Sequence, residues 1–275
     1  MNKLFKKLRK LTRKPVDSVA VVLSGGGSRG AIEVGVLQAL DENDIKVEAI
    51  SGTSIGAIIG ALYSAGISPL QMQEIMARQT LTKIFHFSWS KKGLLSMNEL
   101  LKIFKKYNVQ NSFDLLNIPF YACASNLDTE KGDIFSSGDL FQSVIASASI
   151  PLLFEPVVIN NQHYIDGGLY NNFPIGPLLD KYPYILGVHV NNYKEPEDYN
   201  ALAIAERVFT AVVQQNIVAK LKKCDYLIDP FLENHGSIID FRQTNKLFEI
   251  GYNEGIKFVK SALKKSSTST TSRTA

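Results

Sequence analysis

The residues best suited to covalent chemistry in this 275-residue chain lie in two glycine-rich loops. In the second loop, Ser54 stands two residues after Gly52 and two before Gly56, between an apolar strand-like run and an apolar helix-like run. A serine on a strand-to-helix turn has a strained backbone that exposes its hydroxyl, and the flanking glycines supply clearance. The pattern favours a serine nucleophile, although a plain turn whose serine caps the next helix would have the same residues.

The first loop, Gly25–Gly30, follows the apolar run Val19–Leu23 and precedes residues 31–40, in which apolar side chains recur at helical spacing. A strand, a loop and a helix in this order aim several backbone N–H groups and a helix N-terminus at one point. Such donors suit the negative charge that develops on a carbonyl oxygen during acyl transfer. Together the two loops indicate acyl transfer through a serine.

The first loop also fits a dinucleotide-binding pattern, because Gly25, Gly27 and Gly30 have the spacing G-x-G-x-x-G. That function needs an acidic residue about 20 positions on, at the end of the second strand. The nearest candidate is Glu48, whereas the strand end is occupied by residues 52–54. A nucleotide-binding module therefore stays open as the non-enzymatic alternative.

A nucleophilic serine needs a base, and the chain offers two kinds. Asp166 follows an apparent hairpin with a turn at Asn160-Asn161 and precedes two glycines, which let another backbone approach the carboxylate. A turn-forming Asp-Gly pair is the other interpretation. His189 ends an expected strand, so a histidine-dependent esterase acting on small esters is a second enzyme hypothesis. The four histidines, none in a distinctive motif, are His86, His163, His189 and His235.

Four motifs within residues 19–190 together resemble the patatin-like phospholipase family, in the family's order. They are the loop Gly25–Gly30 (family pattern G-G-G-x-R-G), Gly52–Gly56 (G-x-S-x-G), Ala146–Pro151 (A-S-x-x-x-P) and Asp166–Gly168 (D-G-G/A). The resemblance implies a Ser–Asp dyad without a histidine, in which Ser54 is the nucleophile and Asp166 the base. It also implies a lipid or phospholipid substrate, cleaved at a fatty-acyl ester.

The resemblance also assigns roles to the two loops. The oxyanion hole would be built from Gly25, Gly26 and Gly27, with the N–H groups of Gly26 and Gly27 as donors. Arg29 would support that loop or add positive charge near it, and Gly52 and Gly56 would shape the nucleophile elbow. No residue cluster calls for a metal or another cofactor.

The elements that position these residues follow an alternating pattern. Alternation of strands and helices predicts an α/β fold, here the patatin-like three-layer fold, with a mainly parallel central sheet and helices on both faces. We expect one catalytic domain over residues 16–265. Residues 80–95 are aromatic without a clear period, which suits a lid, an acyl-chain wall or ordinary core. Strands are expected near Val19, Val47, Pro119, Val157, Tyr184 and Asp225, and helix starts at Ser68-Pro69, Ser96–Glu99 and Asp139.

Composition excludes several classes of protein. Two cysteines, Cys123 and Cys224, do not make a disulfide framework or a metal-ligand pattern. No apolar run is long enough for a transmembrane helix, and no signal-peptide core is present. We expect a cytoplasmic protein.

The two ends of the chain differ in charge from the middle. Residues 1–14 carry seven of the 30 basic side chains and no acidic one, with Leu4, Phe5, Leu8 and Leu11 on one helical face. This favours peripheral attachment to the inner membrane surface, and a disordered solubilising tail is the other interpretation. The basic patch does not continue into the domain, so we expect no nucleic-acid partner. The Ser/Thr-rich residues 266–275 are expected to be disordered.

Overall fold

An eight-stranded sheet organises the part of the chain that the computed structural model describes, which comprises residues 16–77, 98–151, 153–193, 201–215, 217–233 and 240–267. The strand order is β5-β6-β3-β2-β1-β7-β8, with β4 paired to β3. The pairs β1–β2, β1–β7, β2–β3 and β7–β8 are parallel, while β4, β5 and β6 join in antiparallel fashion. The predicted α/β fold with a mainly parallel sheet is confirmed.

The elements have the following bounds. The strands are β1 Ser18–Leu23, β2 Lys46–Thr53, β3 Phe120–Asn126, β4 Lys131–Phe135, β5 Val157–Ile159, β6 Gln162–Asp166, β7 Ile185–Val188 and β8 Tyr226–Ile228. The α-helices are α2 Gly30–Asp41, α3 Ile55–Ser64, α4 Pro69–Ala77, α6 Asn98–Lys106, α7 Leu140–Ser147, α8 Gly168–Asn171, α9 Ala201–Gln215, α10 Val218–Leu221 and α11 Thr244–Ser267. Short 3-10 helices are η1 Gly27–Arg29, η2 Phe113–Leu115, η3 Gly176–Leu178 and η4 Phe241–Gln243.

The predicted strand positions and helix starts correspond to observed elements. Asp139 caps α7, where its carboxylate accepts a hydrogen bond from the Gln142 N–H at 2.8 Å. The hairpin turn is also confirmed, because Asn160 and Asn161 have φ angles of 50° and 62°, the left-handed values of a two-residue turn. The prediction omitted β4, a short strand with no fully buried residue.

The core lies on both faces of the sheet, because β1 buries alternate side chains on each side. Val19, Val21 and Leu23 belong to the larger cluster, which also includes residues of α2, α3, α4 and α11. Ala20 and Val22 belong to the smaller cluster on the other face, with residues of η3 and α9. Helices on both faces, as expected, bury β1 and leave its carboxyl end as a place for a site.

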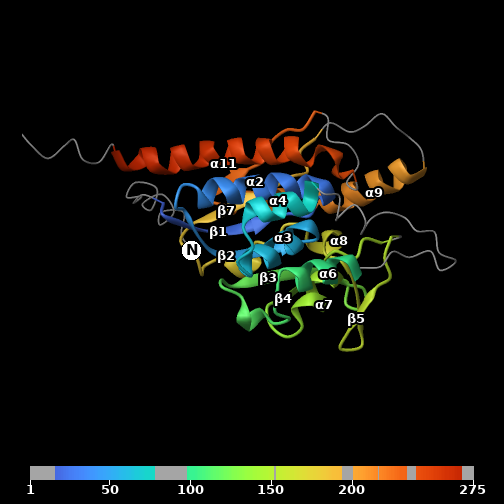
Figure 1. Cartoon of the computed structure of the whole chain (residues 1–275). Coiled ribbons are helices and arrows are strands. Elements are labelled where there is room, and N and C mark those ends of the chain that lie inside the picture. The colour runs from blue at the N-terminus through green and yellow to red at the C-terminus, as the bar shows by residue number, and fades with distance from the viewer. Residues whose placement is uncertain are drawn as a thin grey trace, which may run out of the picture.

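Two glycines bring the backbones of α2 and α11 into contact. A Cβ on Gly35 would collide with the backbone of Phe248 and Tyr252, and a Cβ on Gly251 would collide with the backbone of Ile32. In Figure 1 the red ribbon of α11 lies along the blue ribbon of α2, on the same side of the sheet. Helix α11 thus backs α2, the helix that follows the first glycine-rich loop.

The strands β2 and β6 meet end to end along one edge of β3. Strand β2 runs parallel to β3 and its last residue, Thr53, pairs with Cys123. Strand β6 runs antiparallel, and its last residue, Asp166, pairs with the next residue, Ala124. Because β4 pairs with both of these β3 residues, it occupies the opposite edge, so β2 and β6 share one edge. The residue after β2 is Ser54, which therefore falls beside Asp166.

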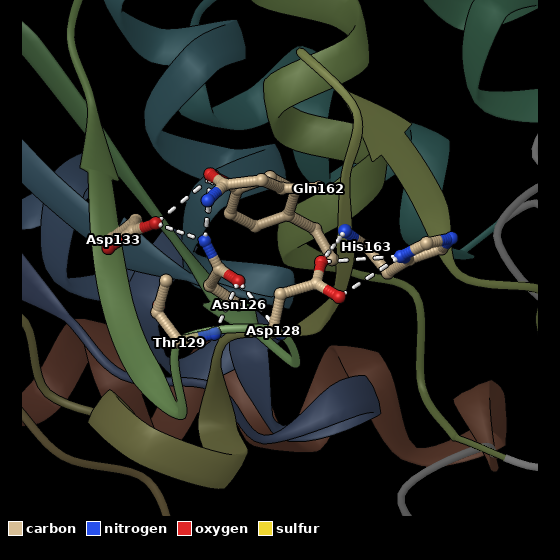
Figure 2. Close-up of polar contacts among 7 residues, drawn as sticks. Asn126, Asp128, Thr129, Asp133, Gln162 and His163 are labelled. Carbon is tan, nitrogen blue, oxygen red and sulfur yellow. Dashed lines mark hydrogen bonds and ion pairs between the residues drawn. The ribbon is translucent and has the colours of Figure 1, made fainter.

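A polar network fastens the β3–β4 turn to β6 (Figure 2). The Asn126 amide nitrogen donates to Asp133 Oδ2 at 2.8 Å and to Gln162 Oε1 at 3.0 Å. Its amide oxygen accepts from the Asp128 N–H at 3.0 Å, and Asp128 Oδ2 accepts from the His163 N–H at 2.6 Å. These bonds fix the register of β6 four residues before Asp166.

Several predicted features lie outside the described residues: the basic segment 1–14, the aromatic segment 80–95, His86 and His235. Helix α11 continues to Ser267, so the first two residues of the Ser/Thr-rich segment are helical, and the remainder lies outside the described residues. Among the helices described, none is long and apolar enough to cross a membrane.

Candidate active site

Ser54 occupies a strained turn between β2 and α3. Its φ and ψ angles are 55° and −122°. Residues other than glycine rarely adopt this combination, because their Cβ atom crowds the backbone. The backbone N–H of Ser54 donates to Ser147 Oγ at 3.0 Å, and Ser147 in turn donates to the Cys123 carbonyl oxygen at 2.6 Å. The strained conformation is thus held by a side chain from α7 that is itself fixed to β3.

The glycines on either side of Ser54 are required by close backbone packing. A Cβ on Gly52 would meet the backbone of Gly56 and lie 2.8 Å from the Ala57 nitrogen. A Cβ on Gly56 would lie 2.7 Å from the carbonyl oxygens of both Leu23 and Ser24. The turn therefore folds back on itself and presses against the end of β1, which brings Ser54 next to the first loop.

Ser54 and Asp166 are joined by a short hydrogen bond. Ser54 Oγ donates to Asp166 Oδ2 at 2.5 Å, and the other carboxylate oxygen accepts from the Gly168 N–H at 2.8 Å. The side chains lie 112 residues apart in sequence and meet because β2 and β6 end at the same place on β3. Gly167 makes this meeting possible, because a Cβ there would collide with the Cys123 carbonyl group.

The environment of Asp166 makes it a better base than an exposed aspartate. Burial raises the pKa of its carboxyl from 3.8 to about 6, although the hydrogen bonds from Ser54 and Gly168 pull the pKa down. Asp166 is 2% exposed and Ser54 7% exposed. A carboxylate with a pKa closer to neutrality accepts a hydroxyl proton more readily, and above about pH 6 it is mostly ionised.

The first glycine-rich loop is clamped by two asparagines. The Gly25 N–H donates to Asn172 Oδ1 at 3.0 Å, and the Gly25 carbonyl oxygen accepts from the side-chain amides of Asn172 at 3.2 Å and Asn191 at 2.7 Å. The Gly25 N–H is therefore already engaged. None of the described residues accepts a hydrogen bond from the N–H of Gly26 or Gly27, so these two donors are available at the start of η1.

Arg29 is buried beneath this loop. Its Nη2 donates to Asn191 Oδ1 at 2.9 Å, and its guanidinium carbon lies 4.5 Å from the centre of the Tyr193 ring. Because Asn191 also holds Gly25, the guanidinium braces the loop through a shared partner. Arg29 also lines the cavity described next, so its positive charge is close to the place where negative charge would develop.

A small cavity connects the two loops. Ser54, Asp166 and the loop Gly25–Gly27 line it, and Thr210 and Val213 of α9 complete part of its described wall. Its volume is about 30 Å³, which is room for about two water molecules. The arrangement places a hydroxyl, a carboxylate and two unused N–H donors around one small cavity, the set of groups that acyl transfer requires.

The described histidines belong to other pairs. His189 Nδ1 lies 2.8 Å from Asp229 Oδ1, and His163 Nδ1 lies 3.2 Å from Asp128 Oδ2. Neither is among the described residues that line the cavity. In the described ranges, no group of three or more histidine, cysteine or acidic residues is placed to hold a metal ion.

Three wall residues were not predicted from the sequence. Asn191 follows β7, and polar residues at the carboxyl ends of parallel strands are a usual source of ligand-binding groups, so this position carried a usable signal. Thr210 and Val213 lie more than 150 residues after Ser54 in a helix without any motif. Only the folded chain brings that helix to the cavity.

Comparisons with known proteins give the same fold. VipD from Legionella pneumophila has a TM-score of 0.53 and 14% identity, with coverage of 90% of this chain and 67% of that one. Lysophospholipase NTE1 of Kluyveromyces lactis is 26% identical over 281 residues, which is 88% of this chain and 19% of the relative. An uncharacterized NTE family protein of Mycobacterium bovis is 29% identical over 162 residues, which is 58% of this chain and 45% of the relative.

The chain thus spans less than half the length of these two sequence relatives. The family comparison covers more of the site. A model described as patatin-like phospholipase matches residues 21–179, which include both glycine-rich loops, Ser147 and Asp166. Because this match takes in more than half of the chain, the chain belongs to the patatin-like phospholipase family.

Proposed function

We propose that this chain is a serine lipid acyl hydrolase of the phospholipase A or lysophospholipase type. It cleaves fatty-acyl esters through a Ser54–Asp166 dyad and an acyl-serine intermediate. The observation that carries the proposal is the hydrogen bond of 2.5 Å from Ser54 Oγ to Asp166 Oδ2, made by a buried carboxylate and a serine in a strained turn. A purely structural Ser–Asp contact needs neither the strain nor the two N–H donors beside it.

In the acylation half of the reaction, Ser54 Oγ attacks the ester carbonyl carbon and its proton passes to Asp166 Oδ2. The carbonyl oxygen becomes negatively charged and accepts hydrogen bonds from the N–H groups of Gly26 and Gly27. When the tetrahedral intermediate collapses, the bond to the leaving alcohol breaks and Asp166 returns the proton to that alcohol. The acyl group remains on Ser54 as an ester.

In the second half, water replaces the alcohol. Asp166 accepts a proton from the water as it attacks the acyl carbon, and the same N–H donors stabilise the second oxyanion. Collapse releases the fatty acid, and the proton on Asp166 returns to Ser54 Oγ. The chemistry needs only groups supplied by this chain and water.

The lipid substrate is supported by the family and by a relative named lysophospholipase that aligns with 88% of this chain. A histidine-dependent esterase is less well supported, because neither of the described histidines, His163 and His189, lines the cavity at Ser54. A nucleotide-binding module is also less well supported. The buried carboxylate of Asp166 faces the same cavity as the loop Gly25–Gly27 and would repel a phosphate group.

The proposal also assigns a role to each part of the chain and places the enzyme at a membrane surface. Residues 16–265 act as one catalytic domain, and residues 1–14 attach it peripherally to an anionic membrane. The support for attachment is the cluster of seven basic residues with four apolar residues on one helical face. Such a segment binds reversibly and leaves the chemistry to the domain.

Two measurements on one preparation test this function. Fluorophosphonate labelling followed by peptide mass spectrometry should place the adduct on Ser54, and incubation with mixed phospholipid vesicles should release free fatty acid. Ser54→Ala should abolish both signals. Labelling at another residue, or fatty-acid release by Ser54→Ala at the wild-type rate, would rule out the proposed nucleophile.

A further inference from the structure

Helix α9 presents one face to the cavity and an exposed apolar stripe on the opposite face. Thr210 and Val213 point inward and line the cavity at Ser54. Ile204, Val208 and Val212 recur every four residues and are 46%, 60% and 37% exposed. At about 3.6 residues per turn, these three side chains form one stripe on the side of the helix away from the cavity. Figure 1 shows the orange ribbon of α9 at the edge of the molecule, beyond α8.

The chain directly after this stripe is apolar and positively charged. Val218 of α10 is 61% exposed, and Lys222 and Lys223 that follow it are exposed. Lys220 is half-buried, and its ammonium group donates to Asn171 Oδ1 at 2.6 Å. Residues 217–224 contain these three lysines and no acidic residue. An exposed apolar stripe followed in the chain by exposed lysines suits an anionic lipid surface, where apolar side chains enter the headgroup region and ammonium groups remain among the phosphates.

The small size of the cavity gives a reason for a lipid-binding surface on α9. A volume of about 30 Å³ is room for water but not for a fatty-acyl chain, so an acyl chain must extend past the described wall, of which α9 forms part. The C-terminal part of α9 is held in place, because the Gln214 amide donates to the Asn191 carbonyl oxygen at 2.9 Å and Ile217 is 2% exposed. The stripe begins at Ile204, nearly three turns before Gln214, and extends past Thr210 to Val212.

We propose that the stripe of Ile204, Val208 and Val212, together with Val218 and the exposed lysines Lys222 and Lys223, is the surface on which the enzyme docks to an anionic bilayer. Docking places the cavity wall formed by α9 against the phase that contains the substrate. The inference rests on the proposed lipid hydrolysis for its choice of partner. It differs from attachment through residues 1–14, because it assigns binding to the catalytic domain itself.

The test compares two double variants of the full-length chain. Val208→Ser with Val212→Ser removes apolar surface from the stripe and keeps a similar helix propensity. Leu70→Ser with Leu115→Ser is the matched control, because these side chains are 52% and 64% exposed at other sites on the molecule. Co-sedimentation with vesicles of phosphatidylcholine and phosphatidylglycerol should be about tenfold weaker for the stripe variant and unchanged for the control.

A second variant tests the exposed lysines without changing any residue of α9. Lys222→Gln with Lys223→Gln should weaken vesicle binding several-fold and reduce its dependence on salt. Turnover of a water-soluble short-chain ester should stay within about twofold of wild type in all three variants. Wild-type vesicle binding by both the stripe and the lysine variants would overturn the proposal. So would a concentration-dependent dimer that the stripe variant abolishes, since the stripe would then be covered by a second copy.

Failure of the docking surface can be told apart from failure of the proposed function. Binding is measured in chains that also carry Ser54→Ala, so that hydrolysis does not alter the vesicles. Loss of binding in the stripe variant supports docking whether or not the wild-type chain releases fatty acid. Fatty-acid release without any contribution of the stripe to binding would leave the function standing and remove the docking surface.

Discussion

At the scale of single residues, the site combines features that cost stability. Ser54 has a strained backbone, and Asp166 is a carboxylate with almost no access to water. A strained non-glycine residue costs about 1–3 kcal/mol, and burial opposes the charged form of a carboxylate. Both features are explained if a nucleophile and its base must be held in contact before substrate arrives.

The pKa of Asp166, about 6, predicts how activity depends on pH. Asp166 must be ionised to accept the proton of Ser54, so kcat/KM for a soluble ester should rise with pH through about 6 and become level above it. The profile should be measured between pH 4.5 and 8.5. A profile that is flat from pH 5 upward would contradict a base with a raised pKa.

The same pKa shift predicts how stability depends on pH. The folded protein holds the Asp166 proton more tightly than the unfolded chain, so this group stabilises the fold at low pH. That contribution is lost as the pH rises from about 4 through about 6. Asp166→Asn should remove this loss, so its melting temperature at pH 7 should equal or exceed that of wild type. A melting temperature several degrees lower at pH 7 would mean that the charge stabilises the fold.

Ser147 is expected to act as a positioning residue. Ser147→Ala removes the acceptor of the Ser54 N–H and leaves that group buried without a partner. We expect kcat to fall about tenfold to a hundredfold with KM little changed. The matched control is Ser143→Ala, which removes another buried hydroxyl of α7, one that donates to the Asp139 carbonyl oxygen at 2.7 Å. Equal effects of the two changes on kcat would indicate general damage to the helix.

At the scale of elements, the contact between Ser54 and Asp166 follows from the way that β2 and β6 approach each other along β3. Local sequence singled out both residues, because a serine in a strand-to-helix turn and an aspartate followed by glycines have short-range patterns. It did not predict their contact, since the pairing of Asp166 with Ala124 depends on which edge of β3 is free. Strand β4 occupies the other edge of β3. Its residues are partly or fully exposed and show no alternation of buried and exposed positions, so the sequence did not predict this strand.

The clamp on the first loop shows the same limit of local sequence. Gly25 and Asn172 are 147 residues apart, and Gly25 and Asn191 are 166 residues apart. The loop was recognisable from its glycines, but the two asparagines that hold it lie far away in sequence, and local sequence does not show that they contact this loop. Sequence could therefore predict the fold class, and it singled out Ser54 and Asp166, which the structure brings into contact. It could not predict that the Gly25 N–H is already occupied.

The contact between α2 and α11 supplies a prediction about stability. Gly251→Ala should destabilise the protein by about 1–3 kcal/mol, because the added methyl group meets the backbone of Ile32 and neither helix can yield by a side-chain movement. Gly176→Ala is the control, since nothing lies within 4 Å of its Cβ position. Urea denaturation measures both, and equal midpoints would show that the helices separate at little cost.

At the scale of the whole molecule, the proposed anchor, residues 1–14, is separate in sequence from the residues that line the cavity. Deleting residues 1–14 should weaken co-sedimentation with anionic vesicles and reduce its salt dependence, because each basic residue near such a surface contributes about 1 kcal/mol. Turnover of a soluble short-chain ester should stay nearly unchanged, since β1 begins at Ser18. Equal vesicle binding by the full and shortened chains would show that the segment is not an anchor.

The central claim is that Ser54 and Asp166 work as one catalytic unit. The most direct test measures kcat for ester hydrolysis in Ser54→Ala, Asp166→Asn and the double variant, with circular dichroism to confirm folding. Residues that act as a unit are strongly non-additive, so all three variants should fall to the same residual rate, at least about a thousandfold below wild type. Substantial activity in a folded Asp166→Asn variant would contradict the dyad.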